Sequence, residues 1–169
     1  MQSDAPCWNF WTEDVKKWDL VFQGYQTLVE FIRTKGPFDG VIGFSQGASA
    51  AATIILNQDR LLGDATLFKC AIFFCGSVPL DMVEAERGRL RWLDLDTDGV
   101  VLRLPTAHIW SDPDDMFPDQ GPCLSALCDE GLKEQVIHNL GHDVPGARSD
   151  EFLRESLTAI RRTLDRAQD

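Results

Sequence analysis

The chain has 169 residues, of which 44% are hydrophobic and 25% charged, and its formal net charge is -11. This composition is that of an ordinary globular protein with one domain, and the acidic charge disfavours nucleic acids and anionic membranes as partners. Five cysteines without a CxxC or Cys/His ligand spacing, and the lack of a membrane-spanning or signal-peptide pattern, predict a cytoplasmic protein with reduced thiols and with no metal or cofactor.

The first predicted element is a helix over about residues 17–34, which follows an irregular, aromatic-rich segment at 1–16. Gly36 stops this helix and Pro37 cannot continue it. Apolar and small residues recur at near-helical spacing along it. This spacing predicts one buried face, made of Leu20, Gly24, Leu28 and Phe31.

The next segments predict a strand, a helix and a second strand. Residues 38–44, "FDGVIGF", are typical of a short buried strand, and residues 46–56, "QGASAAATIIL", of a helix whose small side chains permit close packing. The continuous apolar run at 68–76, "FKCAIFFCG", indicates a parallel strand covered on both faces. Residues 77–103 are mixed and charged, with a helix expected near 80–90, and we expect them to form a cap or pocket insertion.

The last third of the chain repeats the same alternation. We expect strands at 104–110, "LPTAHIW", and at 133–139, "KEQVIHN", with a helix around 121–131 between them. The closing helix starts near Ser149 or Asp150 as its N-cap. Its predicted apolar stripe consists of Leu153, Leu157, Ile160 and Leu164.

This alternation of helices and strands predicts a single α/β domain over residues 1–169. Right-handed crossovers would give a three-layer sandwich, a mostly parallel sheet with helices on both faces. Such sheets place their chemistry in the loops that leave the carboxyl ends of the strands. The three predicted loops that are richest in reactive groups all leave such ends.

The first of these loops contains Ser45 between a predicted strand and a predicted helix. Gly43 and Gly47 flank it in a Gly-x-Ser-x-Gly pattern, which is typical of the nucleophile elbow of serine hydrolases. We expect the glycines to prevent clashes in the tight turn, and the helix that follows to favour a developing oxyanion. The alternative is that Ser45 is only a small residue in a tight turn.

A serine nucleophile needs a base, and histidine side chains, with a reference pKa of about 6.5, usually supply it. Of the three histidines, His142 lies in the loop after the last strand and is favoured over His138 and over His108, which we expect inside a strand. The orienting carboxylate is sought in "SDPDD". Asp114 is favoured there, with Asp112 as the runner-up, and the order Ser…Asp…His is that of α/β-hydrolases.

Three stretches together resemble the fungal serine hydrolase (FSH) family of the α/β-hydrolase superfamily. They are "GPFDGVIGFSQGASAA" at 36–51, "LPTAHIWSDPDDMFP" at 104–118 and "HNLGHDVP" at 138–145. The GFSQG core is shared with carboxylesterases and acyl-protein thioesterases, and the preceding Gly-Pro-Phe-Asp-Gly points to this family. The "DAP" at 4–6 also resembles the end of a family strand.

The resemblance implies an α/β-hydrolase-type fold and a serine esterase or thioesterase that acts through an acyl-enzyme. It implies Ser45 as nucleophile, Asp114 and His142 as the other members of the triad, and the Gln46 N–H as an oxyanion-hole donor. Some family members release polyketide chains from carrier-protein thioesters in fungal secondary metabolism. A hydrophobic acyl substrate and an acyl-carrier-protein partner are therefore implied.

Aromatic side chains are the candidates for an acyl pocket. Trp8 and Trp11 near the N-terminus, and Trp92 within 77–103, are predicted to bind the substrate. The alternative for all three is ordinary packing.

The chain also departs from the family pattern. Ser111 and Leu140 stand where the family often has glycine. The usual N-terminal strand-turn-helix is lacking, so we expect an N-terminally reduced fold without one of the two oxyanion-hole donors. An uncovered sheet edge would favour a homodimer.

Two other functions remain open from the sequence. The chain could be a non-hydrolytic protein of the hydrolase fold that binds or cyclises a hydrophobic metabolite. It could also be an assembly subunit that pairs through its open sheet edge.

Overall fold

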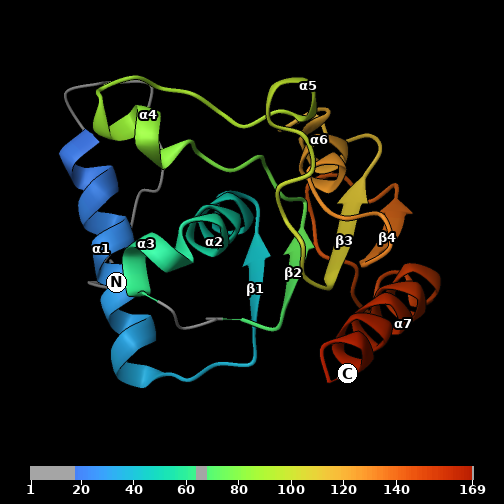
Figure 1. Cartoon of the computed structure of the whole chain (residues 1–169). Coiled ribbons are helices and arrows are strands. Elements are labelled where there is room, and N and C mark those ends of the chain that lie inside the picture. Colours follow the sequence, from blue (N-terminus) through green and yellow to red (C-terminus); the bar gives the residue numbers. More distant parts are fainter. Residues whose placement is uncertain (1–17, 64–67, 169) are drawn as a thin grey trace, which may run out of the picture.

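A four-stranded parallel sheet forms the centre of the computed structural model, which describes residues 18–63 and 68–168 (Figure 1). The strands lie side by side in the order in which they occur along the chain, and each neighbouring pair is parallel. The carboxyl ends of all four strands therefore meet at one edge of the sheet. The strands are β1 (Gly40–Phe44), β2 (Cys70–Phe74), β3 (Thr106–Ser111) and β4 (Lys133–His138).

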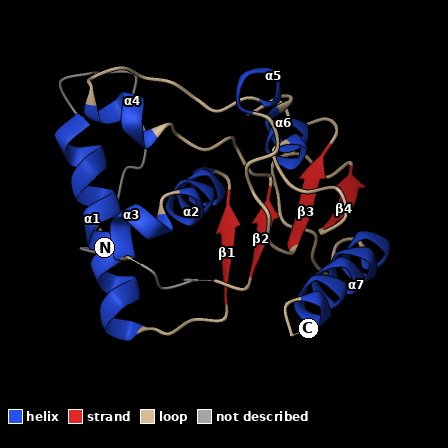
Figure 2. Ribbon diagram, viewed as in Figure 1, coloured by secondary structure: helices blue, strands red, loops and turns tan. Residues whose placement is uncertain are grey.

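Helices cover both faces of this sheet, as the alternation in the sequence predicts (Figure 2). On one face, α2 packs on β1 and β2, and α6 packs on β3, while α1 lies outside α2 and α3. On the other face, α7 packs on β2, β3 and β4. The helices of these layers are α1 (Trp18–Lys35), α2 (Gln46–Leu56), α3 (Gln58–Leu62), α6 (Gln120–Ala126) and α7 (Asp150–Arg166).

Buried apolar side chains form two clusters, one on each face of the sheet, because successive side chains of a strand point to opposite faces. Phe73 and Ala71 face the α2 side and join the larger cluster, whereas Ile72 and Ile109 face the α7 side with Ala159. The expected three-layer α/β-hydrolase-type sandwich is confirmed. None of the described helices combines the length and the apolar character that crossing a bilayer requires.

Segment 77–103 forms two short helices that are linked by ion pairs of Arg91. The helices are α4 (Met82–Glu86) and α5 (Leu95–Asp98). Arg91 donates to the carboxylates of Asp81 at 2.6 Å and Asp98 at 2.5 Å, which ties the start of α4 to the end of α5. The helix that we expected near 80–90 corresponds to α4.

The buried face predicted for α1 is wrong at two of its four positions. Leu20 and Phe31 are 57% and 47% exposed, whereas Tyr25 and Ile32 are buried in the larger cluster. The apolar residues of α1 support two adjacent stripes of the same period, and packing against α2 selects the stripe that contains Tyr25.

The stripe predicted for α7 is also wrong at two of its four positions, whereas Leu153 and Ile160 are partly buried. Leu157 and Leu164 are exposed, and the buried positions are the small residues Ser156, Ala159 and Thr163. Small side chains let the helix backbone approach the sheet closely, and this outweighs the larger leucines. The predicted helix at 121–131 is shorter than expected, since α6 ends at Ala126.

Candidate active site

The three predicted catalytic residues, together with Cys75, lie in loops at one edge of the sheet. Ser45 follows β1, Cys75 follows β2, and the loops after β3 and β4 carry Asp114 and His142. The strand pairing continues into these loops, because the N–H of Ser45 donates to Phe74 O at 2.9 Å and that of Cys75 to Ile109 O at 2.8 Å. The start of each loop is thereby fixed to the neighbouring strand.

Ser45 occupies a sharp turn between β1 and α2. Its φ of 54° and ψ of -123° lie in a region that residues with a side chain rarely adopt, and it is partly buried. Gly43 makes this turn possible, since a Cβ there would lie 2.5 Å from Ala48 Cα and 2.6 Å from Ala48 N. The steric role that we expected for Gly47 is not found, because a Cβ there meets no described atom within 4 Å.

The first turn of α2 lies directly after Ser45. Gln46 is the first residue of this 11-residue helix, so its backbone N–H is at the positive end of the helix dipole. An anion that develops next to Ser45 would face that end. This placement is the one that an oxyanion-hole donor requires.

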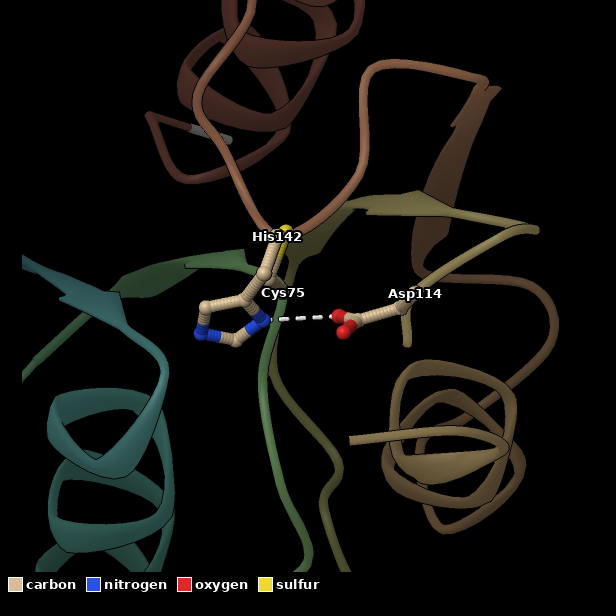
Figure 3. Close-up of side chains that lie close together, drawn as sticks. All are labelled: Cys75, Asp114 and His142. Atoms are coloured by element: carbon tan, nitrogen blue, oxygen red, sulfur yellow. Dashed lines mark hydrogen bonds and ion pairs between the residues drawn. The ribbon is translucent and has the colours of Figure 1, made fainter. Parts of the chain in front are cut away.

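The structure brings Asp114 and His142 together (Figure 3). His142 Nδ1 and Asp114 Oδ2 are 2.7 Å apart, and both side chains are more than nine-tenths buried. Asp114 Oδ1 accepts the backbone N–H groups of Met116 and Phe117 at 3.1 and 2.9 Å, which fixes the carboxylate. The runner-up Asp112 is exposed and contributes no side-chain hydrogen bond to the site.

The electrostatics keep Asp114 ionised. Burial alone would raise its pKa, but the hydrogen bonds from His142 and from two backbone N–H groups outweigh burial and hold the pKa below its usual value. An ionised carboxylate can only accept hydrogen bonds. Nδ1 of His142 therefore carries the proton and donates a hydrogen bond to Asp114. The unprotonated Nε2 is then the nitrogen that can act as a base.

Two aromatic rings enclose the imidazole of His142. Phe44, the neighbour of Ser45, lies with its ring centroid 5.1 Å from that of His142, and Phe117 lies at 5.2 Å. Nε2 is buried and has no hydrogen-bond partner among the described residues. The structure therefore places the imidazole of His142 beside the β1–α2 turn, without a formed hydrogen bond to Ser45 among the described residues.

Two side chains that sequence reasoning did not assign to the site hold the loop of His142. The Ser111 hydroxyl accepts the Gly141 N–H at 3.0 Å, and His138 Nδ1 accepts the Leu140 N–H at 3.2 Å. In the sequence, Ser111 stands out only because the family often has glycine at this position. His138 is buried, and burial lowers its pKa, so its neutral ring can accept this bond.

The other sequence candidates have structural places. His108 is buried within β3, as expected, and its Nε2 lies 3.1 Å from Thr106 Oγ1. Trp92 pairs with Leu80 in an antiparallel bridge. Trp8 and Trp11 lie outside the described residues, as does the "DAP" at 4–6.

A pocket of about 540 Å³ lies beside the site. Phe117 joins the two, because it lines the pocket and contacts the ring of His142. The lining of the pocket is mainly apolar, and α5 and α6 add polar groups to its wall. The lining residues include Trp92, Leu93, Leu95, Asp96, Phe117 and Cys123.

Known serine hydrolases resemble the chain along most of its length. The family described as "Serine hydrolase (FSH1)" matches residues 1–154. Esterase FPY3 of Fusarium mangiferae is 39% identical over 121 residues, which are 70% of this chain and 53% of that protein. Esterase FUS5 of Gibberella moniliformis is 31% identical over 116 residues, 68% of this chain and 43% of that protein. The chain thus spans about half the length of these curated relatives.

Solved structures show the same fold. Zea mays acyl-protein thioesterase 2 superposes with a TM-score of 0.55 at 16% identity, over 97% of this chain and 69% of that one. An alpha/beta hydrolase from the sediment metagenome of the lagoon of Mar Chica superposes with a TM-score of 0.54 at 15% identity. The match covers 86% of this chain and 70% of that one. At these identities the similarity defines the α/β-hydrolase fold alone.

Proposed function

The chain belongs to the FSH1 family of serine hydrolases, and from that premise we propose that it hydrolyses carboxylic esters through an acyl-enzyme on Ser45. The observation that carries this proposal is the buried pair of Asp114 and His142, 2.7 Å apart, at the sheet edge where Ser45 sits on its strained turn. A buried carboxylate that orients an imidazole beside a serine is the arrangement that acyl transfer requires.

The proposed reaction has two halves. Ser45 Oγ attacks the ester carbonyl while His142 Nε2 takes the hydroxyl proton, and the Gln46 N–H stabilises the oxyanion. Collapse of the tetrahedral intermediate breaks the ester bond, and Nε2–H gives its proton to the departing alcohol. Water then attacks the acyl-enzyme with the same proton transfers, which releases the acid and restores Ser45. Asp114 stabilises the imidazolium that forms in each half.

The pocket beside the site supports a substrate with an apolar group. Its volume of about 540 Å³ is in the range of small-molecule sites, and Trp92, Leu95 and Phe117 offer apolar surface. Asp96 at the wall and the net charge of -11 disfavour an anionic group there. We therefore favour a neutral acyl ester, with segment 77–103 as the insertion that forms one wall of the pocket.

A narrower form of the proposal concerns thioesters. The family resemblance favours a role in fungal secondary metabolism, in which a polyketide chain is released from an acyl-carrier protein. The prosthetic arm of an acyl-carrier protein bears a phosphate, which the net charge of -11 would repel. The small neutral ester is therefore the better-supported substrate. Rates on an ester and on the matched carrier-bound thioester would separate the two forms.

A second function is favoured by one observation. His142 Nε2 forms no hydrogen bond with Ser45 among the described residues, as a protein that binds or cyclises a hydrophobic metabolite without hydrolysis would permit. Catalytic hydrogen bonds are often long in the absence of substrate, so hydrolysis remains the first proposal.

An activity-based probe tests the proposal. A fluorophosphonate should add once to the folded protein, and peptide mapping should place the adduct on Ser45. Ser45→Ala should abolish both the adduct and the hydrolysis of small activated esters. The matched control is Ser77→Ala, because Ser77 also lines the pocket but should keep labelling. Labelling of the Ser45→Ala variant would remove Ser45 from the mechanism, and no labelling of the folded wild type would favour the binding function.

A further inference from the structure

Cys75 is a buried thiol at the centre of the site that the proposed reaction does not use. It follows β2 directly, with a φ of 42°, and its side chain is buried. Figure 3 shows the sulfur of Cys75 next to the side chain of His142. The Sγ of Cys75, a carboxylate oxygen of Asp114 and a ring nitrogen of His142 all lie within 4.8 Å of one another.

These three atoms are a ligand set for a soft divalent cation. Zinc binds thiolate, imidazole and carboxylate ligands at about 2.0–2.3 Å in a tetrahedral arrangement, which places ligand atoms about 3.5 Å apart. The pair of His142 and Asp114, at 2.7 Å, would open to admit the ion, and Cys75 would approach it. Both movements are of about 1 Å on this zinc geometry, and water can fill the fourth position.

The surroundings of the three ligands favour a bound cation. Asp114 Oδ1 accepts two backbone N–H groups, so the carboxylate is already oriented. Asp143 supplies its carbonyl to the Cys75 thiol at 3.4 Å. The negative charges of Asp114 and Asp143 act on the thiol of Cys75. The same negative charge that opposes a bare thiolate stabilises a dication between these groups.

We propose that Cys75, Asp114 and His142 form a binding site for Zn²⁺ or a similar thiophilic divalent cation, and that the bound ion switches the hydrolase off. Binding replaces the Cys75 S–H proton, which is released to solvent. The ion takes Nδ1 of His142, so the neutral ring must carry its proton on Nε2 instead. A protonated Nε2 cannot accept the Ser45 proton, and Asp114 is no longer available to stabilise an imidazolium.

The sequence did not reveal this site because its ligands come from three separate loops. Cys75, Asp114 and His142 are brought together by parallel strands whose ends meet at one edge, and no local ligand spacing marks them. The binding of the ion is independent of the proposed esterase activity, whereas the inhibition rests on it.

Two measurements on the full chain test the site. Co²⁺ replaces Zn²⁺ in thiolate sites and gives a near-ultraviolet charge-transfer band when it binds a cysteine sulfur. Wild type should show this band and Cys75→Ala should lose it. Cys123→Ala is the matched control, since Cys123 is an exposed thiol that lines the pocket, and it should keep the band. A band that survives in Cys75→Ala, or that is absent from wild type, would overturn the proposal.

Inhibition is measured on the same variants with a small activated ester. Zn²⁺ should inhibit wild type and Cys123→Ala reversibly, with recovery on chelation. Inhibition of Cys75→Ala should be at least about tenfold weaker, the scale on which metal sites lose affinity when their shell is altered. Equal inhibition of Cys75→Ala and wild type would show that the ion acts elsewhere on the acidic surface.

A conservative variant guards against loss of the fold. Cys75→Ser keeps the size of the side chain but offers a poor zinc ligand. This variant should lose the cobalt band and the inhibition by Zn²⁺, and its thermal unfolding should stay near that of wild type. If wild type hydrolyses no ester, the cobalt band alone still decides the site, so failure of the proposed function and failure of the site are distinguishable.

Discussion

Asp114 divides its two carboxylate oxygens between the backbone and His142. One oxygen accepts the N–H groups of Met116 and Phe117, and the other lies 2.7 Å from Nδ1. These bonds hold the carboxylate in place and keep it ionised, although burial opposes the charge. The orientation and the tautomer of the imidazole are therefore set by a single side chain.

Asp114→Asn tests that role. An amide at this position keeps the shape but cannot stabilise the imidazolium and can favour the wrong tautomer, so kcat should fall by about 10³–10⁴-fold, as in a comparable protease variant. Asp112→Asn is the matched control, because Asp112 is exposed in the same loop, and it should keep wild-type rates. Equal effects of the two variants in steady-state kinetics would contradict the assignment.

Ser111 acts through the backbone of the loop that carries His142. Ser111→Ala leaves the Gly141 N–H without its acceptor, so the loop should lose its fixed position. We expect kcat to fall by up to about 10²-fold with little change in KM, the scale that misplacement of a catalytic group costs. Ser111→Thr restores the hydroxyl and should recover most of the rate. A fall in thermal stability without a fall in kcat would give Ser111 a structural role only.

At the scale of elements, the β1–α2 turn explains which glycine of the elbow is needed. A Cβ at Gly43 would lie 2.5 Å from the backbone of α2, whereas a Cβ at Gly47 would meet no described atom within 4 Å. The two glycines look alike in the pattern Gly-x-Ser-x-Gly. Only the distance between the strand and the helix separates their roles.

Alanine at these two positions should therefore behave differently. Gly43→Ala must push α2 away from β1, and overpacking of this kind costs typically about 1–3 kcal/mol of the free energy of unfolding. Gly47→Ala should be neutral or stabilising by up to about 1 kcal/mol, because alanine favours a helix over glycine. Urea unfolding measures both changes, and fluorophosphonate labelling reports whether the turn survives. Similar losses for both variants would contradict the geometry.

The same contrast shows what a sequence can predict about such a fold. Strands β1 to β4 were predictable because continuous apolar runs and their alternation with helices define a parallel sheet. The helix faces were not, because α1 carries two adjacent apolar stripes and only the position of α2 selects one. Ser45, Asp114 and His142 were proposed as catalytic from their order and their loops, and the structure brings Asp114 and His142 together. The sequence did not predict that Cys75 lies beside them, since its place depends on how the strand ends converge.

At the scale of the whole molecule, buried histidines make the fold sensitive to acid. Burial first, and then the charge of Lys133, lower the pKa of His108 to about 3, against an ordinary value of 6.5. Below about pH 6.5 the unfolded chain therefore binds a proton that folded His108 does not. The free energy of unfolding should fall as the pH drops from 6.5 towards 3, and it should not change for this reason above 6.5.

His108→Gln checks this linkage. The variant removes one proton-binding group from the unfolded chain, so the dependence of stability on pH between 6.5 and 5 should become shallower by up to about 1.4 kcal/mol per pH unit. Urea unfolding at several pH values gives both slopes. Unchanged slopes would mean that His108 is not the group that couples folding to protons.

The sheet also has an uncovered apolar surface at β1. Ile42 shares a face with Ile72, which α7 covers, yet Ile42 itself is 67% exposed, and no described strand pairs with the outer edge of β1. We predict that the chain associates as a homodimer through this surface. Sedimentation at micromolar concentration should show a dimer for wild type and a monomer for Ile42→Lys, with Leu157→Lys on α7 as the exposed control. A wild-type monomer would contradict the prediction.

The strands stand in the sheet in the order in which they leave the ribosome. Each new strand of the nascent chain therefore meets a neighbour that is already made, and synthesis extends the sheet at one side only. Ser45 is in place early, while Asp114 comes after β3 and His142 only after β4. On the proposed mechanism, the growing polypeptide therefore holds Ser45 without its base until β4 has docked. Hydrolysis as we propose it could begin only when translation has delivered the loop that carries His142.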